Sequence, residues 1–299
     1  MKIYFPDYYK DFECIKDKCK HSCCIGWEID IDNASLSYYE SVGGDFGKKL
    51  RDNISLKDTP HFILDKDERC PFLNSSNLCD IYIHCGREHL CEICSNHPRF
   101  VNVFSDREEW GLGMCCEAAA HIILNHKSPV RMICEIPDDT ETEDIIKIRQ
   151  SIINVLQMRN KSIKERFGIL SEEYHIDFSE HKFEYWKEVF LNLEILDNEW
   201  ESILSKDATP DYSWMYKEEY QLMLEQLAVY FVLRYINKEN QDNIKGWLSL
   251  SGLGVYMISE LFAREDNKSG EVFEDLCRMY SSEIEYSLDN VEELLFELA

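Results

Sequence analysis

The sequence predicts a mainly α protein that combines a cysteine-rich metal-binding N-terminal lobe, built of short irregular and β elements, with a C-terminal helical lobe. Apolar residues recur at helical spacing after residue 140, whereas the first 110 residues contain many turn residues. Twelve of the 13 cysteines lie between Cys14 and Cys134. The hydrophobic fraction of 44% is enough for a substantial core, which argues against a disordered chain.

The N-terminal lobe is expected to contain short elements. Turn residues such as Gly43-Gly44, Pro60 and Pro71 interrupt it repeatedly. Apolar and polar residues alternate over residues 27–32, and this alternation predicts a strand. A lobe of this kind has little continuous secondary structure, so we expect bound ligands to help hold it together.

Helices are predicted along the rest of the chain. Residues 116–125 form one, and residues 140–161 form another with an apolar face that follows the cap-like Asp138-Asp139-Thr140. The remaining predicted helices, separated by polar turn segments, cover residues 182–196, 199–204, 215–236, 253–263, 271–280 and 291–298.

The charge distribution supports a division into two parts. The net charge of −25 is split unevenly, with −5 on residues 1–134 and −20 on residues 135–299. We therefore predict a cysteine-rich metal-binding lobe over 1–134 and an acidic helical lobe over 135–299, with the boundary near Pro137. Binding of a nucleic-acid backbone is excluded as the main role because it needs a surplus of Lys and Arg.

The cysteines are expected to be reduced and to bind metal. Residues 1–7 show neither the apolar region nor the cleavage site of a secretory signal, and no segment approaches the roughly 18 apolar residues of a membrane span. A cytoplasmic location with no membrane partner is predicted, and clustered cysteines in that compartment bind metal or carry out redox chemistry. An odd total of 13 also prevents complete internal pairing.

Four groups contain most of these cysteines: Cys14-x4-Cys19-x3-Cys23-Cys24, Cys70 with Cys79, Cys91-x2-Cys94, and Cys115-Cys116. A Zn²⁺ ion or an iron–sulfur cluster takes four thiolates, which such spacings can supply. Adjacent cysteines point in different directions, so in each pair the two residues serve different centres or one of them packs. Cys134 and Cys277 are predicted to be buried small apolar residues.

The motifs C-x4-C-x3-C-C-x-G-W, C-x-F-L, L-C-x-I-Y, C-x3-P-R and C-x-E-A-A occur in order within residues 8–124. This series resembles the flagellin lysine-N-methylase family of bacteria, which overlaps a group of zinc- or iron-chelating proteins. Residues 230–236 resemble the aromatic helix of that family. The resemblance implies a protein-lysine N-methyltransferase with flagellin as partner, S-adenosylmethionine as methyl donor, and a [4Fe–4S] cluster or, as the alternative, zinc.

The resemblance also implies site residues. The cysteines of the family that bind metal fall on Cys14, Cys19, Cys23, Cys24, Cys70, Cys79, Cys94 and Cys115. Local additions to this set are Cys85, Cys91 and Cys116, and a proline is commoner at the last position. Three residues lie inside the matched motifs and are candidates for contact with the cofactor or for structural support of the metal-binding cysteines: Trp27, Arg99 and Glu117. Nearby histidines that offer further ligands are His84, His89 and His97.

The residues leave several alternatives open. No catalytic residue is assigned, because Gly111-Leu112-Gly113 lacks the third glycine of a nucleotide-binding fingerprint and Gly252-Leu253-Gly254 falls in a helical region. The C-x3-C-x2-C spacing of radical enzymes is absent, so neither radical chemistry nor direct displacement is favoured. One rival function is an iron–sulfur or zinc module with a redox or interaction role and no transferase activity. The other is a methyltransferase that acts on a different protein.

Overall fold

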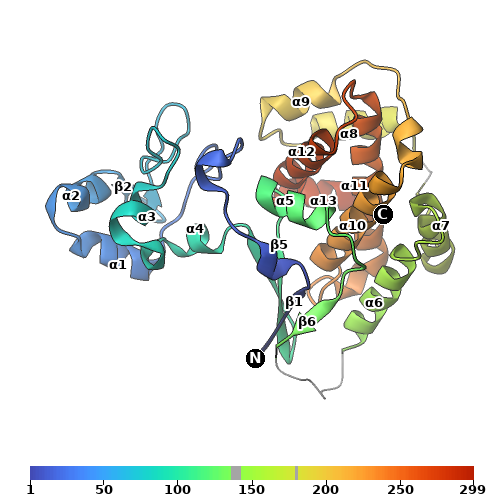
Figure 1. Ribbon diagram of the computed structural model, residues 1–299, viewed down its shortest axis with the longest axis horizontal. Helices are drawn as coiled ribbons and strands as arrows, with labels where there is room; N and C mark the ends of the chain where they lie inside the picture. Colours follow the sequence, from blue (N-terminus) through green and yellow to red (C-terminus); the bar gives the residue numbers. More distant parts are fainter. Residues whose placement is uncertain (136–142, 179–180) are drawn as a thin grey trace. The chain divides into compact units, whose positions relative to one another are not determined.

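The computed structural model describes residues 1–135, 143–178 and 181–299, and these residues form two compact units (Figure 1). Glu13–Phe100 make up the first, which we call the cysteine unit. Met1–Phe12 and Val101–Ala299 make up the second, which we call the helical unit. In the described part of the chain, no helix is both long enough and apolar enough to cross a bilayer.

Short elements build the cysteine unit. Its helices are α1 (Asn33–Ser41), α2 (Gly44–Asp52), α3 (Asp80–Cys85) and α4 (Glu92–Asn96), and a small ribbon pairs β2 (Ile54–Ser55) with β3 (His61–Phe62). Asp32 joins two of the helices: one carboxylate oxygen accepts from the Ser35 amide at 2.9 Å and the other from the Glu92 amide at 2.8 Å. Both amides lie at helix N-termini, where a carboxylate is favourable.

The predicted strand over residues 27–32 is wrong. Ile29 and Ile31 are buried, as their alternation implied, but this segment makes only an isolated bridge between Asp30 and His61. The alternation therefore reflects burial of one side of an extended segment in the small core, and not a place in a ladder of hydrogen bonds.

A four-stranded sheet opens the helical unit, with strand order β4-β5-β1-β6. The strands are β1 (Lys2–Pro6), β4 (Arg99–Val103), β5 (Arg107–Leu112) and β6 (Met132–Cys134). β1 runs parallel to β5 and antiparallel to β6. One sheet therefore contains segments that precede and segments that follow the cysteine unit in the sequence. A buried ion pair between Glu109 and Arg149 ties β5 to the helices.

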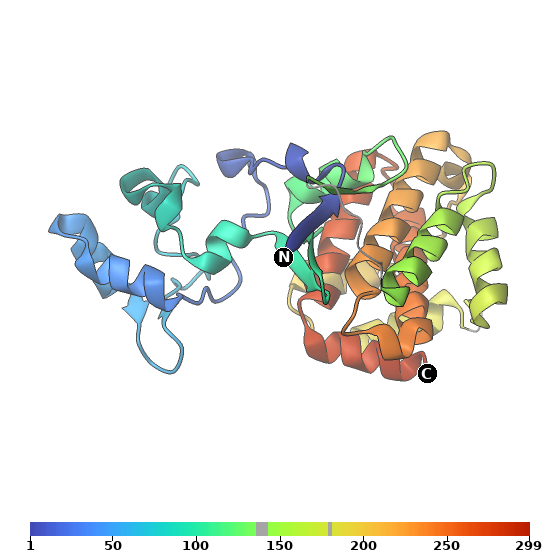
Figure 2. The ribbon, with the colours of Figure 1, turned by 90° about the horizontal axis from the view of Figure 1, so that it is seen from below.

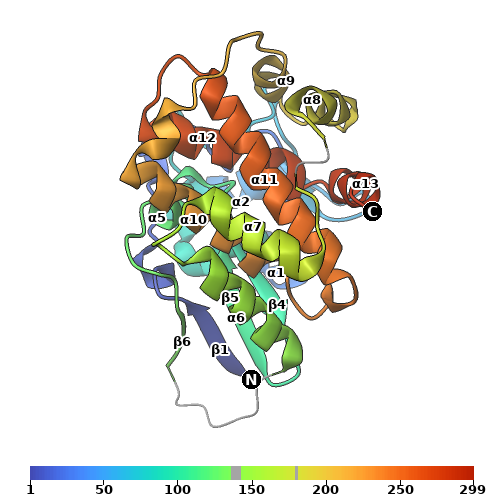
Figure 3. The same cartoon turned by 90° about the vertical axis from the view of Figure 1, so that its right-hand side faces the viewer.

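Helices make up the rest of this unit (Figures 2 and 3). They are α5 (Glu117–Leu124), α6 (Asp144–Leu156), α7 (Ile163–Tyr174), α8 (Phe183–Asn192), α9 (Asn198–Leu204), α10 (Glu218–Tyr235), α11 (Ile244–Arg264), α12 (Gly270–Tyr280) and α13 (Leu288–Glu297), with a π-helical turn, η6 (Ser281–Glu285), after α12. Most side chains of α10 and α11 are buried, because α5 and α6 pack on α10 and α12 packs on α11. The prediction of a mainly α protein is confirmed.

Two predicted boundaries call for comment. α11 begins at Ile244, nine residues before the predicted helix. α7 was not predicted, although Ser162 and Glu165 form a capping box at its start.

The boundary predicted near 134–140 falls mainly on residues outside those described, and the division 1–134/135–299 stays a prediction. The compact units divide the chain elsewhere because β1 pairs with β5 and α5 packs on α10.

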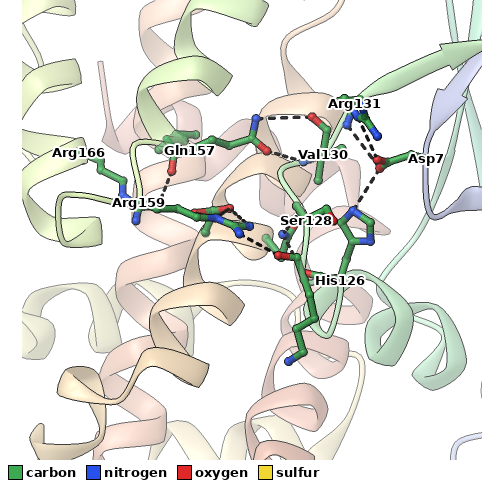
Figure 4. Close-up of polar contacts among 12 residues, drawn as sticks. Asp7, His126, Ser128, Val130, Arg131, Gln157, Arg159 and Arg166 are labelled. Carbon is green, nitrogen blue, oxygen red and sulfur yellow. Dashed lines mark hydrogen bonds and ion pairs between the residues drawn. The ribbon is translucent and has the colours of Figure 1, made fainter.

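The connection between α5 and β6 is held by polar contacts (Figure 4). Gln226 of α10 donates to the carbonyls of His126 and Ser128 at 2.9 and 3.1 Å. His126 Nε2 lies 3.2 Å from a carboxylate oxygen of Asp7, and Arg159 donates to the Lys127 carbonyl at 2.8 Å. These contacts fix the end of α5, the helix whose start carries Cys115 and Cys116.

Candidate functional site

Six cysteines lie in the core of the cysteine unit or pack against it: Cys24, Cys70, Cys79, Cys85, Cys91 and Cys94. All of these except Cys85 act on one another electrostatically. The backbone places them. The Cys70 amide donates to the Cys24 carbonyl at 2.8 Å, and Cys79 pairs with Leu73 in an isolated bridge before it caps α3. Cys91 caps α4 and Cys94 lies within that helix, so the C-x2-C spacing spans a helix N-terminus. We call the five interacting cysteines, without Cys85, the five-thiol cluster.

Electrostatics show that these thiols influence one another. Burial, together with negative charge on Cys24, Cys79 or Cys91, raises the pKa of Cys70 to about 12. A hydrogen bond from Cys23 lowers the pKa of Cys24 to about 7. Within the C-x2-C pair, the hydrogen bond between the two sulfurs lowers the pKa of Cys91 and raises that of Cys94. A bound cation would be needed to hold several of these thiols as thiolates together.

The donor chemistry of the cluster suits a thiophilic metal, since soft thiolates are the ligands that zinc and iron–sulfur centres prefer. Across the described residues, however, no three or more His, Cys, Asp or Glu side chains are arranged to hold a metal ion. Metal binding therefore remains a prediction that the grouping of the thiols supports.

The other cysteines of the cysteine unit take different positions. Cys14 and Cys23 are exposed, and the half-buried Cys19 donates from Sγ to the His21 carbonyl at 3.3 Å. Cys91 is buried in the cluster, although the family motifs set it aside as a local addition. The signal that identifies it is the C-x2-C spacing itself, which is typical of metal sites.

Cys115 belongs to the helical unit and precedes α5. Burial raises the pKa of its thiol to about 12, and a hydrogen bond from Tyr286 favours the thiolate. Of the two residues predicted to be buried small apolar cysteines, Cys277 is buried, as expected, whereas Cys134 is only half-buried in β6.

Trp27 and the histidines have structural contacts. Trp27 Nε1 donates to the Cys23 carbonyl at 2.7 Å, which holds the turn that carries Cys23 and Cys24. The rings of His84 and His89 lie 4.4 and 3.6 Å from the rings of Phe46 and Tyr38. Burial, followed by the charge of Arg99, lowers the pKa of His97 to about 4. The neutral form that results is the one that binds metal.

The remaining candidate contacts lie at element ends. Arg99 begins β4, and Glu117 is the first residue of α5, where a carboxylate complements the helix N-terminus.

The two glycine pairs are not in phosphate-binding loops: Gly111 lies in β5, and Gly252 and Gly254 lie inside α11. A Cβ at Gly252 would come within 2.2 Å of the Phe178 ring, so this glycine serves packing.

A second polar cluster surrounds the buried Glu285 in η6. Its Oε2 accepts hydrogen bonds from the hydroxyls of Tyr230 and Ser281, both at 2.5 Å. The Tyr230 hydroxyl in turn accepts from the Met114 amide at 3.2 Å. The chain next to Cys115 is thereby joined to α10 and η6, two elements that lie more than 100 residues away in the sequence.

The same π turn supplies a pH-dependent term in stability. Glu283 is 1% exposed, and burial raises its pKa from 4.5 to about 7. Because the folded state then binds more protons than the unfolded state in this range, this contribution to the free energy of unfolding is fully present below about 4.5 and is lost as pH rises through about 7. We expect Glu283→Gln to flatten the pH dependence of stability in that window. Urea unfolding of both proteins at several pH values measures it, and parallel profiles would contradict the assignment.

Comparisons with known proteins confirm the predicted resemblance. The chain is 27% identical over 127 residues to the flagellar biosynthetic protein FliU of Salmonella muenchen, a match that covers 40% of this chain and 75% of that protein. It is 23% identical over 159 residues to the lysine-N-methylases of Salmonella typhimurium and Salmonella choleraesuis. This match covers 50% of the chain but only 40% of each methylase. No family model matches the chain, and no solved structure matches it.

Proposed function

We propose that this protein, which resembles the flagellin lysine-N-methylases, is a protein-lysine N-methyltransferase that acts on flagellin in the cytoplasm, before its export. The similarity to two proteins named lysine-N-methylase, together with that to a flagellar protein, carries the proposal. Because the match covers less than half of each methylase, the activity itself is what must be tested.

The methyl donor in this proposal is S-adenosylmethionine, which supplies an electrophilic methyl group when bound. The protein has to orient a lysine amine for in-line attack and remove its positive charge, and an apolar, aromatic-lined site favours the neutral amine by desolvation. The net charge of −25, most of it on residues 135–299, would attract lysine-bearing segments to the helical unit.

The direct test incubates metal-reconstituted protein with flagellin and the methyl donor and examines flagellin peptides by mass spectrometry. Methylated lysines that depend on both the protein and the donor are the expected result. Flagellin whose lysines have been acetylated is the matched control and should remain unmodified. Absence of lysine methylation by protein with its metal intact would favour the alternative, a metal-binding module with a redox or interaction role.

We further propose that the cysteine unit carries a [4Fe–4S] cluster or zinc. The five-thiol cluster in the small core of this unit supports this proposal. An anaerobic preparation that is brown and absorbs broadly in the visible range would indicate iron–sulfur, whereas a colourless one with stoichiometric zinc would exclude it.

Two single substitutions decide which cysteines hold the metal. If the five-thiol cluster is the centre, Cys91→Ala should release metal and unfold the cysteine unit, because metal binding and folding are coupled. Cys14→Ala, at an exposed position, should then retain the metal. The family motifs alone predict the opposite result. Elemental analysis per chain and circular dichroism measure both, and Cys277→Ala, in the helical unit, is the control for loss of a buried thiol.

A further inference from the structure

A cavity of about 200 Å³ lies in the helical unit between α11, α8 and the end of α13. Both α8 and α13 pack on α11 (Figure 3). Four residues of α11 line the cavity and follow one another at helical intervals: Lys245, Ser249, Leu253 and Tyr256. Such intervals place them on one face of the helix. Because sites for drug-sized ligands occupy about 300–1,000 Å³, this cavity suits a smaller molecule.

Three aromatic rings contribute to the wall of the cavity. They belong to Phe178, Trp186 and Tyr256, which come from three different segments of the chain. Gly252 also lines the cavity, and because it has no Cβ, which would come 2.2 Å from the Phe178 ring, that ring can lie against α11. An apolar group of a ligand would be stabilised here by its removal from water.

Two buried polar groups on the same wall have no hydrogen-bond partner within the described residues: the Ser249 hydroxyl and the Trp186 indole N–H. The two residues are only 4% and 6% exposed. Elsewhere on α11, Ser251 and Ser259 donate to the carbonyls four residues earlier, at 2.8 and 2.7 Å. Buried polar groups are nearly always paired, so Ser249 and Trp186 are expected to bond to something in the cavity.

Charged side chains of both signs also line the cavity. Lys245 is exposed, so the cavity opens to solvent beside it, and in the described part of the chain its ammonium group has no carboxylate partner. Glu297 of α13 accepts the Tyr185 hydroxyl on Oε2 at 2.5 Å, which leaves Oε1 for a further donor. Asp177 adds a second negative charge. The cavity therefore offers hydrogen-bond donors with a cation, and carboxylate oxygens, to one small ligand.

We propose that this cavity binds a free amino acid with an apolar side chain. The carboxylate of the ligand accepts from Ser249 and Trp186 and pairs with Lys245, and its ammonium group pairs with Glu297. Its side chain lies against the aromatic rings. An acid without an amino group would meet the negative charges of Glu297 and Asp177 uncompensated. An amine without a carboxylate would leave the donors unpaired.

Calorimetric or NMR titration of the full chain with L-leucine tests the proposal. Isocaproate, which lacks the amino group of leucine, and isoamylamine, which lacks its carboxylate, are the matched probes. We expect saturable binding of L-leucine and binding at least tenfold weaker for each analogue, because each loses one charged pair in a partly buried site.

Substitutions locate the binding in this cavity. Lys245→Gln and Glu297→Gln should each weaken the binding of L-leucine at least fivefold, and Ser249→Ala should weaken it several-fold. Ser251→Ala is the matched control and should leave binding unchanged, because the Ser251 hydroxyl bonds within α11 and does not line the cavity. Circular dichroism and melting temperature establish that each variant folds.

Equal binding of L-leucine and either analogue, or full affinity in folded Lys245→Gln or Glu297→Gln, overturns the proposal. So does an absence of saturable binding, which would leave water as the partner of Ser249 and Trp186. The assay contains no methyl donor and no flagellin. Its outcome is therefore independent of the proposed methyltransferase activity, and either proposal can fail without the other.

Discussion

Glu225→Ala is expected to lower the free energy of unfolding by about 3–5 kcal/mol, the cost of breaking a buried ion pair on one side. Glu225 is fully buried on α10 and forms ion pairs with Arg159 and Arg166, the two arginines labelled in Figure 4. Its Oε1 lies 2.8 Å from Arg159 Nη2 and its Oε2 lies 2.7 Å from Arg166 Nη1. Loss of the carboxylate leaves Arg166 as an uncompensated buried charge, since that side chain is only 3% exposed.

Urea unfolding of the intact chain measures this effect. Glu218→Ala, an exposed change at the start of the same helix, is the control and should cost less than about 1 kcal/mol. Comparable losses in the two variants would show that the buried ion pairs contribute little beyond helix propensity.

Phe262→Ala should cost a similar amount, about 3–5 kcal/mol, by a different mechanism. The ring is fully buried on α11, and its centroid lies 4.9 Å from that of Trp214, 5.2 Å from that of Phe273 and 5.3 Å from that of Tyr220. Truncation removes these contacts and leaves a cavity between rigid rings that cannot collapse fully.

The matched control for this cavity is Phe296→Ala, which makes the same chemical change at a side chain that is 76% exposed on α13. We expect a loss of less than about 1 kcal/mol there. Urea titration monitored by tryptophan fluorescence compares the two, and a Phe262→Ala variant as stable as Phe296→Ala would contradict the assigned core.

Prediction of the helices from sequence worked where the signal is local. Apolar spacing and turn residues identified α8, α9, α10, α12 and α13 to within a few residues. The start of α11 was missed because Gly246, Gly252 and Gly254 lower helix propensity, and close packing against Phe178 and Phe231 is what selects glycine at the last two. Residues 27–32 failed for a related reason: alternation reports burial, and whether a partner strand exists depends on distant segments.

Three properties of this protein can be recognised without its structure: it is mainly helical, its cysteines concentrate before residue 135, and it resembles the flagellin lysine-N-methylases. Each of these depends on composition, on short-range spacing or on motif order, which need no knowledge of packing. The position of Cys91 beside Cys24, Cys70, Cys79 and Cys94 in one core, and the hydrogen bonds of Tyr230 and Ser281 to Glu285, follow from tertiary packing. Contacts between segments far apart in the chain depend on how whole helices and strands pack, and local sequence patterns do not predict them.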